Sequence, residues 1–337
     1  MGLAKNTGKT VTLIVLLQEL GAAGRTVGVT SVGRDGEEHD VIDSRIEKPR
    51  VRLLSGSLVA TTDDLLRASG IPHELLERTA VRTPLGRVLI ARLRGSGAIE
   101  VAGPAAAADV RMVSDAMLAH GADQVLIDGA IDRRAASSPE VSDGLVIATG
   151  AILSRDPAEV VARTRDAVEL VRLAEVGRGG DDGLALRAVA GRSLLLAQDR
   201  EPVELEPRFV LTSDAAAIGR LLDASPEARR LTVAGALPES FLDGLLLALR
   251  QRRRELAVVV ADPTRAFLTR HGPGWYAAQG VQIEVLSEIS LRAVTVNPVA
   301  PRSHTLDSAE LRALLRAAIP GVPIFDVLHP EYRGAPR

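Results

Sequence analysis

Short apolar runs alternate with longer amphipathic segments along most of the chain. The apolar runs predict β-strands at 26–32, 51–54, 57–60, 87–93, 98–102, 124–128, 145–148, 230–234, 256–261, 281–286, 291–296 and 323–327. The amphipathic segments predict helices at 10–20, 61–68, 73–78, 104–120, 157–173, 238–252, 264–270 and 309–318. Strands and helices that alternate in this way indicate an α/β fold built mainly on parallel sheets.

Two interruptions of this pattern organise the chain. Residues 177–183 are rich in Gly and Asp, which is typical of a loop between domains. We therefore expect a first domain at 1–176 and a second α/β region at 177–337, either separate or continuing the sheet of the first. Residues 94–97 (Arg-Gly-Ser-Gly) lie between two predicted strands and predict a hairpin there.

Composition and charge exclude several classes of function. The 337 residues carry a formal net charge of −2, so no global field attracts nucleic acid or an anionic membrane. The aromatic residues are only four Phe, two Tyr and one Trp, too few for a protein that binds single strands by base stacking. The absence of Cys excludes disulfides, thiol catalysis and Cys-ligated zinc.

The location of the protein can also be predicted from the pattern. No apolar run approaches the roughly 20 residues of a membrane span, so we expect a cytoplasmic protein without a membrane segment. The basic and apolar residues at 5–17 resemble a secretory signal. Against that interpretation, Gln18 and Glu19 follow at once, and the segment 26–32 then predicts a strand.

The opening segment concentrates residue types that are rare elsewhere in the chain. Lysine occurs only at Lys5, Lys9 and Lys48, and asparagine only at Asn6 and Asn297. Most of these residues lie within the first ten positions. The segment ends in Gly-Lys-Thr, which is how a phosphate-binding loop ends before its helix.

This segment predicts a nucleotide site. The strict phosphate-loop pattern places four residues between its first Gly and Gly-Lys-[Ser/Thr], whereas Gly2 leaves five. In either spacing, backbone N–H groups of the loop and helix start point at phosphate oxygens. Lys9 would bridge the β- and γ-phosphates of ATP, and the Thr10 hydroxyl would bind Mg²⁺. The predicted nucleotide-binding residues are Asn6, Thr7, Gly8, Lys9 and Thr10. The alternative is an ordinary helix start capped by Thr.

A second acidic position strengthens the nucleotide interpretation. Residues 124–128 form an apolar strand that ends in Asp128, an arrangement in which the carboxylate holds Mg²⁺ directly or through water. The alternative is a turn or helix-cap Asp. The polar segment 130–143 that follows, with Asp132, Arg133 and Ser137, is a candidate switch that senses the γ-phosphate.

Three further positions are candidates for the same site. Asp35 follows the strand at 26–32 and is the predicted catalytic acid beside Lys9 and Asp128. Glu37 and Asp40 are its rivals, and a solvated acidic loop is the alternative. Lys48 would contact phosphate or a substrate anion, or lie on the surface.

Asn297 ends the apolar strand 291–296 just before a proline. At a strand end of an α/β sheet it could contact the base or ribose of the nucleotide. An Asx-turn before the proline is the alternative, and composition favours it.

Several stretches resemble one known family. GLAKNTGKTVTL, VGVTSVGRDGEEHDV, KPRV and VLIDGAIDRRAASSPEVSDGLVIATGA are similar to the dethiobiotin-synthetase-like P-loop NTPases, and within them to the P-loop subunit of lysine 5,6-aminomutase reactivase. The resemblance covers the first half of the chain well and the second half loosely. It implies an ATPase that works with a MutS-like partner to exchange damaged cobalamin in an adenosylcobalamin-dependent aminomutase. It also implies a base-binding role for Asn297.

The sequence departs from that family at its start. Relatives carry an apolar strand before the loop, and this sequence begins at the loop. The fold predicted is therefore a mainly parallel P-loop NTPase domain without its first strand, with an upstream start codon as the simplest explanation. Three functions stay open: a regulatory ATPase, a dethiobiotin-synthetase-like ligase or kinase acting on a small carboxylate, and a non-catalytic interaction protein.

Overall fold

A computed structural model describes residues 1–33, 50–129, 137–176, 192–197, 202–206, 208–301 and 303–328. The chain forms two compact units, Met1–Val161 with Arg292–Arg337, and Ala162–Leu291. The units therefore divide at 161 and 291, whereas the sequence predicts one boundary after 176. The last residues return to the first unit because β16 and β19, described below, pair beside β8 of that unit.

The first unit contains a five-stranded mixed sheet with the order β4-β5-β3-β1-β7. Its strands are β1 (Val27–Ser31), β3 (Leu58–Thr62), β4 (His73–Thr83), β5 (Gly86–Leu93) and β7 (Gln124–Asp128). The strand β1 runs parallel to β3 and β7, and β5 runs antiparallel to β3 and β4. The α/β class predicted from the pattern is confirmed at this level.

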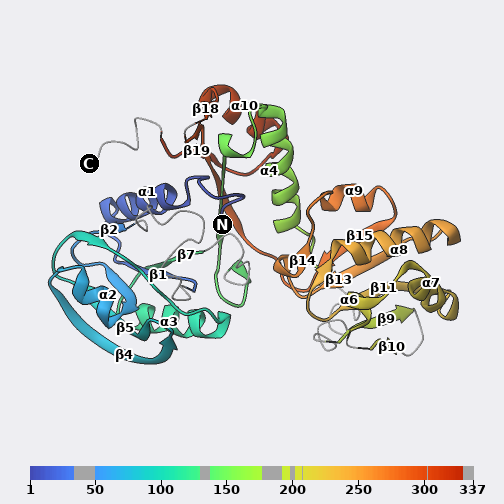
Figure 1. Cartoon of the computed structure of the whole chain (residues 1–337), viewed down its shortest axis with the longest axis horizontal. Coiled ribbons are helices and arrows are strands. Elements are labelled where there is room, and N and C mark those ends of the chain that lie inside the picture. The colour runs from blue at the N-terminus through green and yellow to red at the C-terminus, as the bar shows by residue number, and fades with distance from the viewer. Residues whose placement is uncertain are drawn as a thin grey trace. The chain divides into compact units, whose positions relative to one another are not determined.

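Helices cover both faces of this sheet (Figure 1). Leu13 and Leu17 of α1 (Lys9–Ala22) pack with Val29 on one face. Met117 of α3 (Ala107–Ala119) packs with Leu58 on the other. Because both faces are covered, β1 and β3 are buried along their whole length, as in the double-sided sheets of α/β proteins. This explains their continuous apolar runs.

A second sheet of the first unit has the order β19-β16-β8 and is built from β8 (Leu145–Gly150), β16 (Leu291–Asn297) and β19 (Ile324–Asp326). The strand β16 runs parallel to β19. The carboxyl ends of β8 and β16 meet, because a Cβ on Gly150 would lie 2.0 Å from the Asn297 carbonyl oxygen. The helix α10 (Ser308–Ala318) contacts β19, and α4 (Pro157–Val171) follows β8 after a short turn.

The remaining elements of the first unit are short. They are β2 (Val51–Leu53), α2 (Asp63–Ala68), β6 (Gly97–Ile99), η2 (Ala151–Leu153), β17 (Val299–Ala300) and β18 (His304–Thr305).

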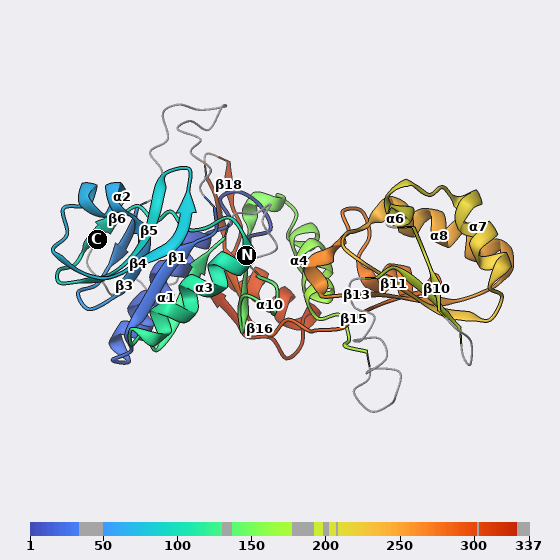
Figure 2. The ribbon, with the colours of Figure 1, turned by 90° about the horizontal axis from the view of Figure 1, so that it is seen from below.

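The second unit contains its own sheet (Figure 2). The order of its strands is β10-β9-β11-β13-β15. Its strands are β9 (Leu194–Ala197), β10 (Val203–Glu204), β11 (Ala228–Val233), β13 (Leu256–Val260) and β15 (Val281–Val285). The strands β11, β13 and β15 run parallel to one another. The helices in its described residues are α6 (Phe209–Thr212), α7 (Ala215–Ala224), α8 (Glu239–Arg252) and α9 (Pro273–Ala277). Side chains of these helices and of the sheet form a large apolar core.

Three local predictions are wrong. Residues 73–78 form the start of strand β4, because pairing with β5 and the burial of Thr79 and Val81 override a helical pattern. The strand β6 pairs with β2 instead of forming a hairpin with β5. Residues 264–270 hold only the turn η3 (Pro263–Arg265) and β14 (Ala266–Phe267), which pairs with β12 (Leu237–Pro238).

Among the helices in the described part of the chain, none is both long enough and apolar enough to cross a membrane.

A buried carboxylate fixes one loop of the second unit. Glu239, in the first turn of α8, accepts the Thr269 hydroxyl at 2.6 Å and backbone N–H groups of residues 269–271 at 3.0–3.1 Å. Burial opposes ionisation, but these hydrogen bonds outweigh it and lower the pKa of Glu239 from 4.5 to about 2. Burial also raises the pKa of Tyr276, whose hydroxyl faces Glu239 and Asp243.

We predict that Glu239→Gln destabilises the second unit by roughly 3 kcal/mol at neutral pH. A pKa lowered by folding stabilises the protein above the unfolded pKa, and this stabilisation is lost as pH falls from 4.5 towards 2. The difference from wild type should therefore shrink by about half near pH 3. This difference in unfolding free energy is measured by urea unfolding followed by the fluorescence of Trp275, which is the single Trp and lies in this unit.

Glu204→Gln is the matched control, because Glu204 is exposed on β10. It should leave the unfolding free energy unchanged at both pH values. If Glu239→Gln lowered the unfolding free energy equally at neutral and acidic pH, the lowered pKa of Glu239 would not be the cause of the stabilisation.

Candidate functional site

The segment 2–8 starts beside β8 and leads directly into α1. Gly2 pairs in parallel with Ala148 of β8, and the Leu3 N–H donates to the Ala148 carbonyl at 3.0 Å. The chain then turns, and the buried Thr7 hydroxyl donates to the Ala4 carbonyl at 3.1 Å. The loop is thus anchored at the carboxyl end of a strand, where ligands of α/β sheets usually bind.

Two residues of this loop have left-handed backbone conformations, Asn6 with φ of 66° and Gly8 with φ of 91°. Gly8 is the N-cap of α1, and no side chain caps the helix there. The first helical bond runs from the Thr12 N–H to the Gly8 carbonyl at 2.8 Å. The N–H groups of residues 9–11 therefore precede the helical ladder, and such groups form the anion-binding end of a helix.

Asn297 joins this loop to β16. Its Nδ2 donates to the Asn6 carbonyl at 3.2 Å, and its Oδ1 accepts the Val299 N–H at 3.1 Å. The second bond is the Asx-turn expected as the alternative. The first was not expected, and it holds the carbonyl of a strained residue. The role of Asn297 in contacting a base stays a prediction.

Gly2 occupies a position with no room for a side chain. A Cβ there would lie 2.6 Å from Thr7 Oγ1 and 2.7 Å from Lys9 Cδ. The stem of Lys9 therefore crosses directly over Gly2. This close approach gives a physical reason for a Gly at the head of the loop, one position earlier than in the strict motif.

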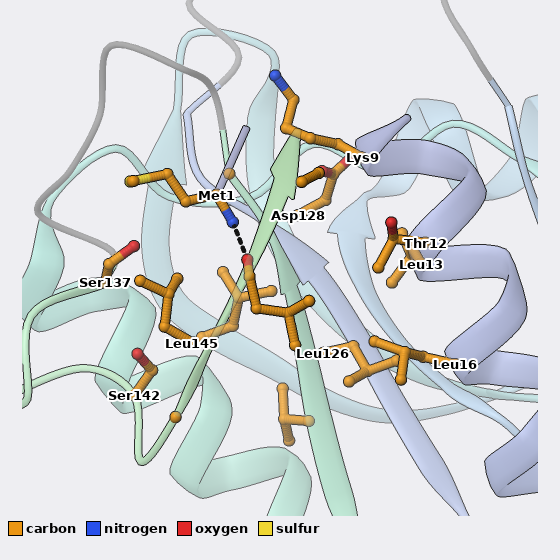
Figure 3. A pocket seen from close by; sticks show the side chains of 16 residues that line it. Met1, Lys9, Thr12, Leu13, Leu16, Leu126, Asp128, Ser137, Ser142 and Leu145 are labelled. Carbon is orange, nitrogen blue, oxygen red and sulfur yellow. Dashed lines mark hydrogen bonds between the residues drawn. The ribbon is translucent and has the colours of Figure 1, made fainter. Parts of the chain in front are cut away.

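Lys9 and Asp128 lie at the same end of a groove beside the loop (Figure 3). Both act on the α-amino group of Met1, which lies next to them. Burial, with a smaller contribution from Lys9, lowers the pKa of this amine to about 6, while Asp128 acts in the opposite direction. The structure therefore brings the predicted cation and the predicted metal-binding acid together around one point.

The groove lies between the strands β7 and β8, with the helix α1 along one side. It is lined by Thr12, Leu13 and Leu16 of α1, by residues 125–128 of β7 and by residues 145, 146 and 148 of β8, with Ser137 and Ser142 at its side. About 910 Å³ of it is not filled by atoms, its open mouth included.

The other predicted residues fall into two groups. Thr10 is half-buried in the first turn of α1, and Ser137 lines the groove. The remaining candidates lie outside the described residues, namely Asp35, Glu37, Asp40, Lys48, Asp132 and Arg133.

A magnesium site would use the oxygen atoms of Thr10 and Asp128. Hard oxygen donors suit Mg²⁺, which takes few protein ligands and completes its shell with water and phosphate oxygens. Over the ranges that the structure describes, no three His, Asp or Glu side chains gather as a metal cluster. That Thr10 and Asp128 hold Mg²⁺ stays a prediction.

A hydroxyl pair that the sequence did not reveal connects the helix to the second sheet. Thr12 Oγ1 lies 2.8 Å from Thr295 Oγ1, and the Thr295 hydroxyl donates to the Ile147 carbonyl at 3.4 Å. This pair connects α1 with β16 and β8. The only signal in the sequence is a Thr within the apolar run 11–17, and that signal does not identify the partner.

No protein-family model, curated protein or solved structure matches this chain. The geometry defines an α/β protein in which a loop at residues 2–8, with a Gly at each end, leads into the N-terminus of a helix.

We predict that Gly2→Ala destabilises the first unit by about 1–3 kcal/mol, because the new Cβ overlaps Thr7 and the Lys9 stem. Hydrogen exchange of the Thr12 and Ala148 N–H groups, which donate to the Gly8 and Met1 carbonyls, measures this locally. Gly129→Ala is the control, since no residue that the structure describes lies within 4 Å of a Cβ there. It should change stability by no more than about 0.5 kcal/mol. Equal exchange in both variants would show that Gly2 is not needed.

Proposed function

We propose that this protein binds ATP with Mg²⁺ and hydrolyses it as a P-loop ATPase. The observation that carries the proposal is the loop at residues 2–8. It has two left-handed positions, leads into the N-terminus of α1, and places Lys9 beside Asp128 at the carboxyl edge of the sheet. A helix N-terminus with an adjacent lysine favours phosphate groups over other ligands.

Each residue of the proposed site has a role that follows from its chemistry. The N–H groups of the loop and the first turn of α1 would bind phosphate oxygens, and Lys9 would neutralise charge on the β- and γ-phosphates. Thr10 and Asp128 would hold Mg²⁺, which supplies charge stabilisation to the transferring phosphoryl group. Asp35 is proposed as the acid that orients the attacking water.

The proposed cellular role rests on the sequence resemblance alone. It is that of a reactivase subunit, in which ATP hydrolysis with a MutS-like partner drives exchange of damaged cobalamin in an adenosylcobalamin-dependent aminomutase. A ligase or kinase acting on a small carboxylate is the alternative among enzymes.

One observation favours a second candidate, an interaction protein that binds nucleotide without hydrolysing it. The strand β7 pairs with β1 along one edge, and its other edge lies at the groove. Its residues 125–128 are therefore only half-buried, and the proposed metal ligand Asp128 is the last of them. Catalysis requires ligands held to within a fraction of an ångström.

We predict that Lys9→Ala weakens ATP binding at least tenfold, because the phosphates then lose their cationic partner. Titration calorimetry in the presence of Mg²⁺ measures the dissociation constant. Lys5→Ala is the matched control, since it removes a lysine from the same loop at an exposed position. Equal affinities for the two variants would reject the nucleotide site.

We predict that Asp128→Asn lowers ATP turnover roughly a hundredfold while changing ATP affinity much less. The amide keeps the size of the side chain and can contact metal-bound water, but it lacks the charge that positions Mg²⁺. Steady-state hydrolysis and calorimetry separate the two effects. Wild-type protein that binds ATP without hydrolysing it would favour the interaction protein.

The reactivase role has its own assay. An aminomutase inactivated by its substrate is mixed with this protein, the MutS-like partner, ATP and fresh adenosylcobalamin. Recovery that requires wild-type Asp128 supports the role. No recovery with wild type would remove the reactivase role while leaving the ATPase proposal intact.

A further inference from the structure

The hairpin of β4 and β5 forms one edge of the five-stranded sheet (Figure 1). The strand β4 has 11 residues and pairs with β5 along one side. Within the described residues, no strand pairs with its other side. Such an edge is a template for another strand, and proteins usually protect it with charged residues and bulges. The strand β4 carries both features, but one of the charges involved lies on β5.

A β-bulge shortens β4 relative to β5. Arg78 lies opposite Leu89, and Arg82 lies opposite Arg87, so the four positions from Arg78 to Arg82 span two positions of β5. Two positions of a strand are about 7 Å long. Residues that lie opposite each other, or two apart on one strand, have side chains on the same face. The three arginines therefore share one face of the hairpin, with their Cα atoms within about 8 Å of one another.

The bulge is fixed by hydrogen bonds. Thr79 and Val81 lie within it, and each is only 4% exposed. The Thr79 hydroxyl donates to the Val88 carbonyl at 2.8 Å and accepts the Val81 N–H at 3.2 Å. Bulges of this kind redirect the side chains of a strand. Here the bulge brings Arg78 and Arg82 together, because residues four apart on a regular strand are separated by about 13 Å.

The three arginines have no counter-charge. All of them are exposed, and no hydrogen bond or ion pair involves their side chains in the part of the chain that the structure describes. The acidic residues of β4 do not compensate, because Glu74 pairs with Arg94 and Glu77 with His120. Like charges directly opposite each other destabilise a sheet. The arginine pair across β4 and β5 is therefore unfavourable for the hairpin by itself.

Protection of the edge does not explain this arrangement. A charge protects an edge when it lies on the edge strand, whereas Arg87 lies on β5, which pairs with β3 and β4. The arrangement fits carboxylates supplied from outside the chain, because a guanidinium group binds a carboxylate through two parallel hydrogen bonds. In a strand added beside β4, side chains two positions apart would be separated by about 7 Å. This distance matches the spacing of Arg78 and Arg82.

The surroundings of the arginines favour a protein segment over other anions. Small ligands are usually bound in concave sites that bury most of their surface, whereas all three arginines are exposed. Nucleic acids are bound through many phosphate contacts, and a net charge of −2 gives no global field that attracts them. The unpaired side of β4 offers backbone hydrogen bonds that a polypeptide strand can complete.

We propose that the outer edge of the β4–β5 hairpin binds an extended acidic segment of a partner protein, whose alternate carboxylates pair with Arg78, Arg82 and Arg87. The backbone of the segment lies along β4 and extends the five-stranded sheet. The carboxylates neutralise the arginine pair that is unfavourable in the free hairpin. The proposal does not depend on the nucleotide site, because β4 and β7 are at opposite ends of the strand order.

The test uses the full chain and a fluorescent peptide of about seven residues, in which Glu alternates with Thr and Val. Fluorescence anisotropy at low salt measures its dissociation constant. A peptide with Gln in place of each Glu should bind at least tenfold more weakly. The double variant Arg82→Gln with Arg87→Gln should lose about tenfold in affinity for the Glu peptide, because two exposed ion pairs are removed.

The matched control is Arg208→Gln with Arg220→Gln, which removes the same charge from exposed positions of the second unit. It should leave the affinity for the Glu peptide unchanged. Equal affinities of the wild-type chain for the Glu and Gln peptides would overturn the proposal. So would an equal loss of affinity in the two double variants.

A second measurement separates binding from a structural role of the arginines. Without peptide, Arg82→Gln with Arg87→Gln should be at least as stable as wild type in urea, followed by circular dichroism, because a like-charge pair is removed. Saturating Glu peptide should slow hydrogen exchange of the β4 N–H groups at least tenfold in the wild-type chain. A variant that is less stable or does not fold, or exchange that does not slow, would contradict the assignment.

Two other occupants would give distinct results. Protection of β4 that rises with protein concentration in the absence of peptide, and is lost in the Arg82→Gln and Arg87→Gln variant, would assign the edge to a second copy. Binding of inorganic phosphate or of a single-stranded oligonucleotide that requires these arginines, with no binding of the Glu peptide, would assign it to a phosphate ligand. Either result would overturn the proposed partner.

Discussion

The parallel backbone pairing of Met1–Leu3 with β8 is the constraint on which the candidate site depends. It places the start of the loop at the carboxyl end of a strand, and α1 follows from there. The meeting of the Met1 amine, Lys9 and Asp128 is a consequence of this placement. Had the loop started elsewhere on the sheet, the same residue types would not form one electrostatic site.

The rest of the first unit supports this arrangement from two sides. The Thr12–Thr295 hydroxyl pair connects α1 to β16, and Asn297 holds the carbonyl of Asn6. The two contacts join residues that are 283 and 291 positions apart in the sequence. They explain why the last part of the chain returns to the first unit. The second unit is organised separately, around its own sheet and the buried Glu239 carboxylate.

Much of the fold could be predicted because most elements have strong local patterns. The strands β1, β7 and β13 and the helices α1, α3 and α8 lie close to their predicted ranges, since their periodicity reflects burial on the sheet. Predictions were wrong where pairing between distant segments decides the structure. Residues 73–78 have a composition compatible with a helix but form part of β4, which pairs with β5. The strand β6 pairs with β2 and not with β5, its neighbour in sequence.

The sequence by itself determined the loop, because its requirements are local. A positive φ occurs at Asn6 and Gly8, the position of Gly2 has no room for a side chain, and Lys9 supplies the charge. It also determined Asp128 as the end of an apolar strand. Only the tertiary structure decided that Lys9 and Asp128 share one groove, that Asn297 supports the loop, and that the edges of β7 and β8 face a common space. These facts depend on the order of strands in a sheet, which is set by contacts between segments distant in sequence and leaves no local signature.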